Sequence, residues 1–144
     1  IRALVFLRGG PLEQFGDPAT VERALRQAEL VIVMDLLPSA VSERAHWVLP
    51  GVSFAEKDGT FTNSKGRVQR IRKVLTIRGD TREDWRILQD LGRALGVLAA
   101  ADPDPERIFL RLAQSVPAFA GLSYSAVGEL GAPTEAATAD VAVG

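Results

Sequence analysis

Two short runs of continuously apolar residues lie at 3–7 and 30–34. Continuous apolarity, without alternation, is typical of strands buried on both faces of a parallel sheet. Between the runs, Asp17-Pro18 supplies a helix N-cap and a first-turn proline. The apolar residues that follow recur at helical spacing: Val21, Ala24, Leu25 and Ala28. The order strand, helix, strand predicts a βαβ unit whose two strands are adjacent, parallel and buried, with neither at an exposed edge.

The next segment carries shorter elements. Residues 39–45 predict one or two helical turns, and residues 47–49 predict a third strand before Pro50. From Val52 to Ile77 turn-forming residues separate apolar and β-branched ones, which indicates extended or hairpin structure.

The last third of the chain has helical periodicity. One helix is predicted to start near Asp80, which with Glu83 three residues later resembles a capping box. A second starts at Asp104-Pro105, and a short third starts near Ser123, with Leu130 facing inward and Gly131 as its cap. Residues 132–144 are small and weakly patterned, so we expect a linker or strap there.

These elements predict an α/β fold. We expect a Rossmann-like, mainly parallel sheet with flanking helices over residues 1–78, including an extended or hairpin segment around 59–77. A helical part of the same domain follows over 79–131, and the linker or strap covers 132–144. Because the first residues already lie inside an apolar strand, we interpret the sequence as a segment of a longer chain; a processed small protein is the alternative.

Composition excludes several classes of partner and of site. Of 144 residues, 47% are hydrophobic and 24% charged, with a formal net charge of −1, so the overall charge does not favour nucleic acid or an anionic membrane as a partner. No apolar run is long enough for a membrane-spanning helix. There is no cysteine, which excludes disulfides and cysteine-bound iron–sulfur clusters within these residues.

Few residues suggest chemistry. Gly9 and Gly10 follow a strand, but the spacing of a dinucleotide-binding glycine motif is missing. Asp35 ends the second strand, where parallel sheets bind ligands, and its carboxylate could accept hydrogen bonds from a purine or ribose; capping the next helix is an equal alternative. For His46, a packed or capping role outweighs catalysis.

A basic stretch follows the hairpin turn. It could bind a phosphate or an acidic partner, although a solvated strand face is the commoner use of such residues. Its members are Lys65, Arg67, Arg70, Arg72, Lys73 and Arg78.

Residues 49–70, LPGVSFAEKDGTFTNSKGRVQR, resemble a hallmark of the molybdopterin oxidoreductase superfamily, roughly L-P-x-x-x-x-x-E-x-x-G-T-x-x-N-x-E-G-R-x-Q. Residues 30–35 and 45–50 are similar to neighbouring family segments. Residues 116–131 resemble a segment of the large peripheral subunit of bacterial NADH-quinone oxidoreductase (complex I). The hallmark also has a structural rationale: Gly59 and Gly66 permit positive φ, Asn63 can bind its own turn, and Arg67 can brace backbone carbonyls.

The departures from the family pattern lie at its nucleotide site. Molybdenum and tungsten members read G-x-N-P after the first strand, where this chain has Arg8-Gly9-Gly10-Pro11. A T-E-T-like run that joins the aspartate in guanine recognition is replaced by Ser39-Ala40-Val41. The vestigial nucleotide-site candidates are therefore Gly9, Gly10, Asp35 and Ser39. The resemblance with these departures implies a decayed site that does not bind molybdopterin guanine dinucleotide.

Such decay is expected in the complex I branch. The resemblance then implies a non-catalytic scaffold segment without a cofactor or metal of its own, with iron–sulfur clusters elsewhere in the parent subunit. Its partners would be the remaining domains of that subunit and other peripheral-arm subunits, on the cytoplasmic side of the bacterial inner membrane, without membrane insertion or nucleic acid. The alternatives are a fragment of a molybdenum enzyme such as a formate dehydrogenase or nitrate reductase, and a free-standing α/β binding module.

Overall fold

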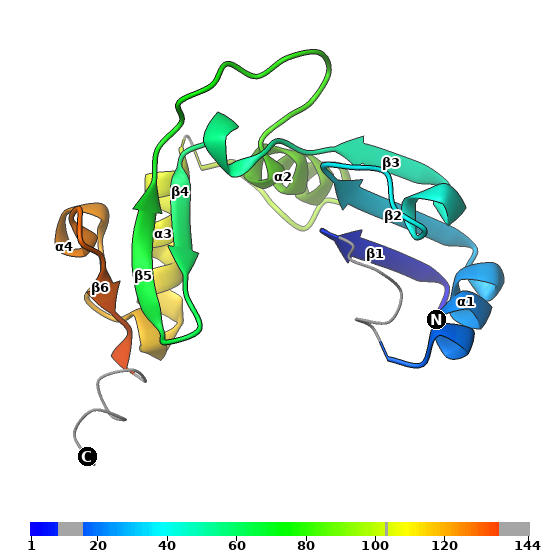
Figure 1. Cartoon of the computed structure of the whole chain (residues 1–144), viewed down its shortest axis with the longest axis horizontal. Helices are drawn as coiled ribbons and strands as arrows, with labels where there is room; N and C mark the ends of the chain where they lie inside the picture. The colour runs from blue at the N-terminus through cyan, green and yellow to red at the C-terminus, as the bar shows by residue number, and fades with distance from the viewer. Residues whose placement is uncertain (9–15, 103, 136–144) are drawn as a thin grey trace. The chain divides into compact units, whose positions relative to one another are not determined.

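The computed structural model describes residues 1–8, 16–102 and 104–135 (Figure 1). The chain forms two compact units. Unit 1 comprises Ile1–Ser53 and Ile77–Leu88, and unit 2 comprises Phe54–Thr76 and Gln89–Gly144. The predicted α/β class is confirmed, because the structure combines a parallel three-stranded sheet, flanking helices and a helical C-terminal part.

Unit 1 is built on the predicted βαβ unit. Strands β1 (Ala3–Leu7), β2 (Leu30–Asp35) and β3 (Trp47–Pro50) form a parallel sheet in that order (Figure 1). Helix α1 (Pro18–Gln27) connects β1 and β2, and Asp17 caps it as predicted by accepting the Thr20 N–H at 2.9 Å. The residues of its core share one cluster: Leu25, Ala28, Val31, Val33 and Val41, with Leu4, Phe6, Val21 and Ala45 packed against them.

The expectation that β1 is buried on both faces is wrong. Among the described residues β1 lies at the edge of the parallel sheet, and its side chains alternate between half-buried and exposed. Leu4 and Phe6 face the core, whereas Val5 and Leu7 are 51% and 53% exposed. Leu4 and Phe6 pack against the core cluster that includes Leu25 of α1. Within unit 1, no described element covers the opposite face of β1, which carries Val5 and Leu7. Only the central strand β2 matches the prediction from continuous apolarity.

His46 completes the sheet at the start of β3. Its backbone N–H donates to Val31 O at 2.9 Å, and its Nδ1 accepts the Val31 N–H, also at 2.9 Å. The imidazole therefore substitutes for a backbone carbonyl beside the central strand. This is a structural role of the kind expected for His46. Residues 39–45 contain the predicted helical turn as a 3-10 helix, η2 (Ser42–Arg44).

Unit 2 is built on an antiparallel sheet. Strands β4 (Gly59–Thr62) and β5 (Arg67–Ile71) form the predicted hairpin, which ends at Ile71 and not at Ile77. Ala132–Pro133, expected to begin a linker or strap, pairs with β5 as strand β6. The described helical elements that lie wholly in unit 2 are η3 (Phe54–Glu56), α3 (Pro105–Ser115), η4 (Pro117–Phe119) and α4 (Tyr124–Val127).

The helices of the last third follow their predicted caps in two cases of three. Asp104 caps α3 and Ser123 caps α4, each through its side chain. However, α2 (Asp84–Ala94) starts four residues after Asp80, and Glu83 instead accepts the first helical N–H groups through its backbone carbonyl. Helix α4 ends at Gly128, with φ 58°, so Gly131 is not its cap. Leu130, predicted to face inward, is 87% exposed.

Candidate functional site

The carboxyl ends of the three parallel strands meet at one edge of unit 1. Arg8, Asp35 and Gly51 lie there, at or directly after the end of β1, β2 and β3. Backbone hydrogen bonds join them to the neighbouring strands, from Arg8 N to Met34 O at 2.8 Å and from Gly51 N to Asp35 O at 2.9 Å. Open parallel sheets bind ligands beyond the carboxyl ends of their strands, which is this edge of unit 1.

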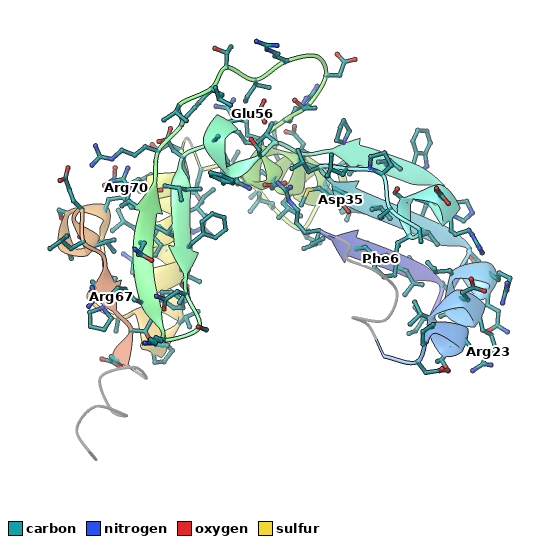
Figure 2. All side chains as sticks on the ribbon, viewed as in Figure 1. Phe6, Arg23, Asp35, Glu56, Arg67 and Arg70 are labelled. Carbon is teal, nitrogen blue, oxygen red and sulfur yellow. The ribbon has the colours of Figure 1, made fainter. Side chains whose placement is uncertain are left out.

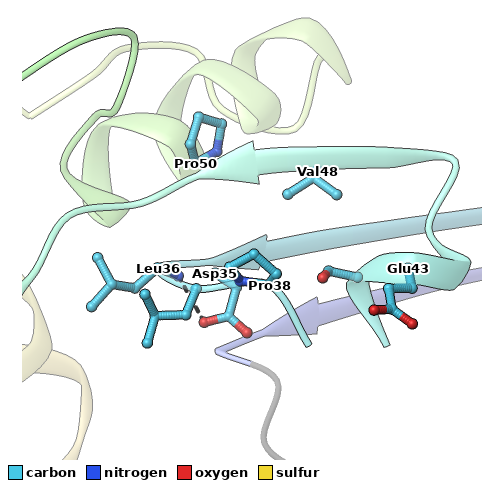
Figure 3. A pocket seen from close by; sticks show the side chains of 8 residues that line it. Asp35, Leu36, Pro38, Glu43, Val48 and Pro50 are labelled. Atoms are coloured by element: carbon cyan, nitrogen blue, oxygen red, sulfur yellow. Dashed lines mark hydrogen bonds between the residues drawn. The ribbon is translucent and has the colours of Figure 1, made fainter. Parts of the chain in front are cut away.

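A pocket of about 340 Å³ opens beside Asp35 (Figure 3). Its walls come from the end of β2, the turn that follows it, η2 and β3. Most of the lining is apolar, with three polar side chains. The lining residues are Asp35, Leu36, Leu37, Pro38, Ser42, Glu43, Val48 and Pro50. An apolar pocket with a few polar groups at this position is the usual form of a small-molecule site.

The Asp35 carboxylate is fixed but incompletely satisfied. Its Oδ1 accepts the N–H of Leu36 at 2.7 Å, as the dashed line in Figure 3 marks. Within residues 1–8, 16–102 and 104–135, the structure shows no protein donor to Oδ2. An ionised carboxylate accepts several hydrogen bonds. Asp35 therefore retains acceptor capacity toward a ligand in the pocket.

The Ser39 hydroxyl is used by the turn after β2. Ser39 Oγ accepts the N–H of Ser42 at 3.2 Å, while Ser42 Oγ accepts the N–H of Ser39 at 2.7 Å and donates to Ser39 O at 2.9 Å. These reciprocal bonds start η2. Ser42 lines the pocket, whereas Ser39 is not among its lining residues. The other two predicted candidates, Gly9 and Gly10, lie outside the described residues.

An ion pair stabilises the same edge of the sheet. Arg8 has a left-handed backbone, with φ 59°, and its Nη2 lies 2.7 Å from both carboxylate oxygens of Asp84. The same nitrogen donates to Val52 O. A Cβ at Gly51 would lie 2.6 Å from Asp84 Oδ1, so a side chain at this position would displace the Asp84 carboxylate. We call Arg8, Gly51, Val52 and Asp84 the Arg8 clasp.

Sequence reasoning reached Asp35 but missed the rest of the pocket. The rule that ligands bind beyond the strand ends points equally to Leu36, Leu37 and Pro50, which flank the ends of β2 and β3. Glu43 and Val48 had no comparable signal. Their place at the pocket depends on the tight turn that the two serines form, which the sequence pattern does not reveal.

Three arginines of the basic stretch make contacts within unit 2. Arg67 Nη1 donates to the carbonyls of Leu130 and Gly131 at 3.2 and 2.7 Å. The guanidinium of Arg70 stacks 3.6 Å from the centre of the Tyr124 ring, and Arg72 lies 3.6 Å from Glu129. Arg67 and Arg70, labelled in Figure 2, both extend from β5. These three arginines connect β5 to the segment around α4 and β6.

The structural rationale for the hallmark is confirmed at three positions. Gly66 has φ 71°, and Asn63 Oδ1 accepts the N–H groups of Lys65 and Arg67 at 2.9 Å each. Arg67 braces backbone carbonyls, as described above. Gly59 differs from the expectation, since it lies in β4 opposite Ile71 without a positive φ. The hallmark residues therefore shape unit 2.

Within the described part of the chain, no three His, Cys, Asp or Glu residues are grouped so as to hold a metal ion. In the same residues, no helix has the length and apolar character needed to cross a membrane.

The sequence was compared with known families and proteins. The family model for molybdopterin oxidoreductase matches residues 1–94. The F420-dependent formate dehydrogenase 2 subunit alpha of Methanococcus maripaludis is 37% identical over 119 residues, which are 82% of this chain and 18% of that protein. The NADPH-Fe(3+) oxidoreductase subunit alpha of Geobacter sulfurreducens is 37% identical over 122 residues, 85% of this chain and 14% of that protein.

Formate dehydrogenase H of Escherichia coli is 29% identical over 131 residues, 91% of this chain and 18% of that protein. The chain thus spans less than a fifth of the length of these relatives. Their names support the molybdenum-enzyme alternative better than the complex I interpretation. Because the family model covers well over half of its residues, the chain belongs to the molybdopterin oxidoreductase family.

Proposed function

We propose that the chain is the segment of a formate dehydrogenase-type molybdopterin oxidoreductase alpha subunit that holds the guanine end of a pterin–guanine dinucleotide. The names of the relatives support this assignment. The observation that carries it is the Asp35 carboxylate, at the carboxyl end of a buried parallel strand and beside an apolar pocket. The bound cofactor would supply the redox chemistry, and this segment would orient its nucleotide end.

The chemistry of the pocket fits a guanine base. Guanine presents two neighbouring donors, N1–H and the N2 amino group, to which one carboxylate can bind. Asp35 has the free acceptor capacity for that contact, and its Oδ1 is already held in place by Leu36 N. Hydrogen bonds to a charged acceptor are stronger than neutral ones. Leu36, Pro38 and Val48 offer apolar surface to a flat base.

This proposal differs from the sequence-based expectation of a decayed site. That expectation rested on the loss of polar groups near Asp35, and Ser39 is indeed occupied by its own turn. One carboxylate and an apolar pocket are nevertheless sufficient to select guanine over adenine, because adenine presents an acceptor where guanine presents N1–H. We therefore expect weak but base-specific binding by the isolated segment.

Calorimetric titration of the chain with GMP, IMP and AMP tests the proposal. We expect a dissociation constant for GMP of about 0.1–1 mM, which is roughly −4 to −5.5 kcal/mol. IMP, which lacks the N2 amino group, should bind less tightly, and AMP least. Asp35→Ala should weaken GMP binding by about tenfold or more, since a hydrogen bond to a charged group contributes roughly 1.5–3 kcal/mol.

Glu29→Ala is the matched control, because Glu29 precedes the other end of β2 and pairs with the exposed Arg2. It should leave GMP binding unchanged. If the wild-type chain does not bind GMP, or binds all three nucleotides alike, the proposal fails and the scaffold interpretation is favoured.

A further inference from the structure

Among the described residues that line the pocket beside Asp35 there is a second carboxylate and no basic side chain. Glu43, on η2, lines it together with Asp35 (Figure 3). The third polar lining residue is Ser42, and the other five are apolar. A nucleotide entering this pocket therefore meets two acids and no positive charge from the lining.

The nearest cations along the chain are engaged elsewhere. Arg44 follows Glu43 directly, but its guanidinium lies 3.4 Å from Glu22 on α1. Arg8, at the same edge of the sheet, binds both oxygens of Asp84. Both arginines are thus paired with other carboxylates. Glu43 has no ion pair within the described residues, so its charge remains uncompensated by unit 1.

We propose that this pocket binds the nucleoside part of the nucleotide alone, with Glu43 accepting hydrogen bonds from ribose hydroxyls, and that it excludes phosphate. The inference rests on the proposed function, since it takes guanine as the base held by Asp35. Hydroxyl groups donate to a carboxylate, whereas a phosphate beside Glu43 would place like charges together. The phosphates of a bound dinucleotide then lie outside the pocket.

Titration with guanosine, GMP and GDP tests this inference on the intact chain. We expect guanosine to bind at least as tightly as GMP, and GDP to bind more weakly than either. Added salt should strengthen GMP binding, because it screens repulsion between like charges. A site that attracts phosphate shows the opposite salt dependence.

Glu43→Gln separates the two roles of the side chain. It should tighten GMP binding about two- to fivefold, a range expected for one exposed charge interaction. It should also reduce the preference for guanosine over 2′,3′-dideoxyguanosine. Glu29→Gln, at the opposite end of β2, should change neither property. Tryptophan fluorescence verifies that unit 1 is folded in each variant. The salt dependence of GMP binding is measured on the wild type, so that test does not depend on the folding of any variant.

The outcomes for the two proposals are distinguishable. If guanosine does not bind, the proposed function fails. If guanosine binds through Asp35 but affinity increases from guanosine to GMP to GDP, the proposed function stands and phosphate exclusion is overturned. Equal binding of guanosine and its dideoxy analogue by the wild type would overturn the role of Glu43.

Discussion

At the scale of single residues, the Arg8 clasp is the most demanding arrangement in unit 1. Arg8 adopts a left-handed backbone, which side-chain-bearing residues disfavour by roughly 1–2 kcal/mol. Its ion pair with Asp84 is partly shielded, since the two side chains are 35% and 16% exposed. By contrast, Arg2 and Glu29 form a pair that is 85% and 62% exposed. The two pairs flank the same strand and differ mainly in burial.

Arg8→Ala should lower the free energy of unfolding of unit 1 by about 1–3 kcal/mol, between the values for exposed and buried pairs. Arg8→Gly loses the same ion pair but relieves the backbone strain, so it should be less destabilising. Urea denaturation followed by tryptophan fluorescence measures both changes, because Trp47 and Trp85 both belong to unit 1.

Arg2→Ala is the control for the Arg8 variants and should cost less than about 1 kcal/mol. If Arg2→Ala and Arg8→Ala destabilise unit 1 equally, the clasp contributes no more than a surface ion pair.

Sequence reasoning works at this scale where a residue acts on its own neighbours. Asn63 and Arg67 were assigned correctly, because a turn and an extended strand place their side chains in known directions. The clasp could not be predicted, since Arg8 and Asp84 are 76 positions apart and meet only in the folded unit. Glu43 was missed for a different reason: the turn that carries it to the pocket is local, but the spacing of Ser39 and Ser42 does not reveal their reciprocal hydrogen bonds.

At the scale of elements, helix caps are the best-defined local determinants. Asp17 accepts both the N–H and the hydroxyl of Thr20, at 2.9 and 2.7 Å. Both hydrogen bonds lower the pKa of the Asp17 carboxyl; the bond from the Thr20 hydroxyl has the larger effect, followed by the bond from the Thr20 N–H. The cap therefore favours the ionised carboxylate over the protonated one.

This cap should make the stability of unit 1 depend on pH. Because the pKa of Asp17 is lower in the folded state, its stabilisation is complete above the unfolded value of about 3.9 and is lost as the pH falls through the folded value. Asp17→Ala should thus be less stable than the wild type at neutral pH, and the difference should shrink in acid. Urea titrations at several pH values measure it.

Asp17→Ser provides the comparison, since a serine caps without titrating. A difference between the wild type and Asp17→Ser that stays constant down to strongly acidic pH would contradict the role of the carboxylate.

The elements themselves were largely predictable, and their environment was not. Caps at Asp17, Asp104 and Ser123 mark three helix starts correctly, because capping depends on nearby atoms. The burial of β1 was overestimated, since continuous apolarity does not reveal whether a second layer covers the strand. The start of α2 was misplaced because the spacing of Asp80 and Glu83 resembles a cap that the backbone does not form.

At the scale of the whole molecule, the two units carry different chromophores. Both tryptophans lie in unit 1, while the single tyrosine, Tyr124, lies in the core of unit 2 with 7% exposure. Burial raises the pKa of the Tyr124 hydroxyl, and the nearby Arg70 guanidinium partly opposes that effect. Within the described residues neither the hydroxyl nor Arg70 Nε has a hydrogen-bond partner.

Unit 2 should therefore lose stability in alkali. Below the ordinary tyrosine pKa of about 10, the Tyr124 hydroxyl is neutral in the folded and the unfolded chain, so its contribution to stability is complete. Above that pH the unfolded chain ionises first, and the stability of unit 2 falls until the pH has passed the higher pKa of the folded state. The ultraviolet absorbance of tyrosinate reports this single group directly. Its midpoint should lie above that of the denatured chain.

Tyr124→Phe should remove this part of the alkaline destabilisation of unit 2. Identical tyrosinate titrations for the native and denatured chain would show that Tyr124 is not shielded in solution.

The division of the molecule into two units was the least predictable feature. The sequence pattern suggested boundaries near 78 and 131, which no observation tests directly. In the structure, Ile77–Leu88 belongs to the same compact unit as residues 1–53. Residues 77–88 rejoin unit 1 through contacts such as the β-bridge between Gly51 and Arg82. A contact of this kind produces no hydrophobic periodicity in the sequence.

This return has a consequence for biosynthesis. A chain emerging from the ribosome presents β1, α1, β2 and β3 well before Arg82 and Asp84 have been translated. Until then Arg8 lacks its carboxylate, and the backbone of Pro50 lacks the N–H of Arg82. The whole β4–β5 hairpin is synthesised in that interval. Unit 1 therefore cannot mature by strict vectorial order. A stalled or truncated nascent chain ending before residue 82 would lack the contacts that complete the carboxyl-end edge of the parallel sheet.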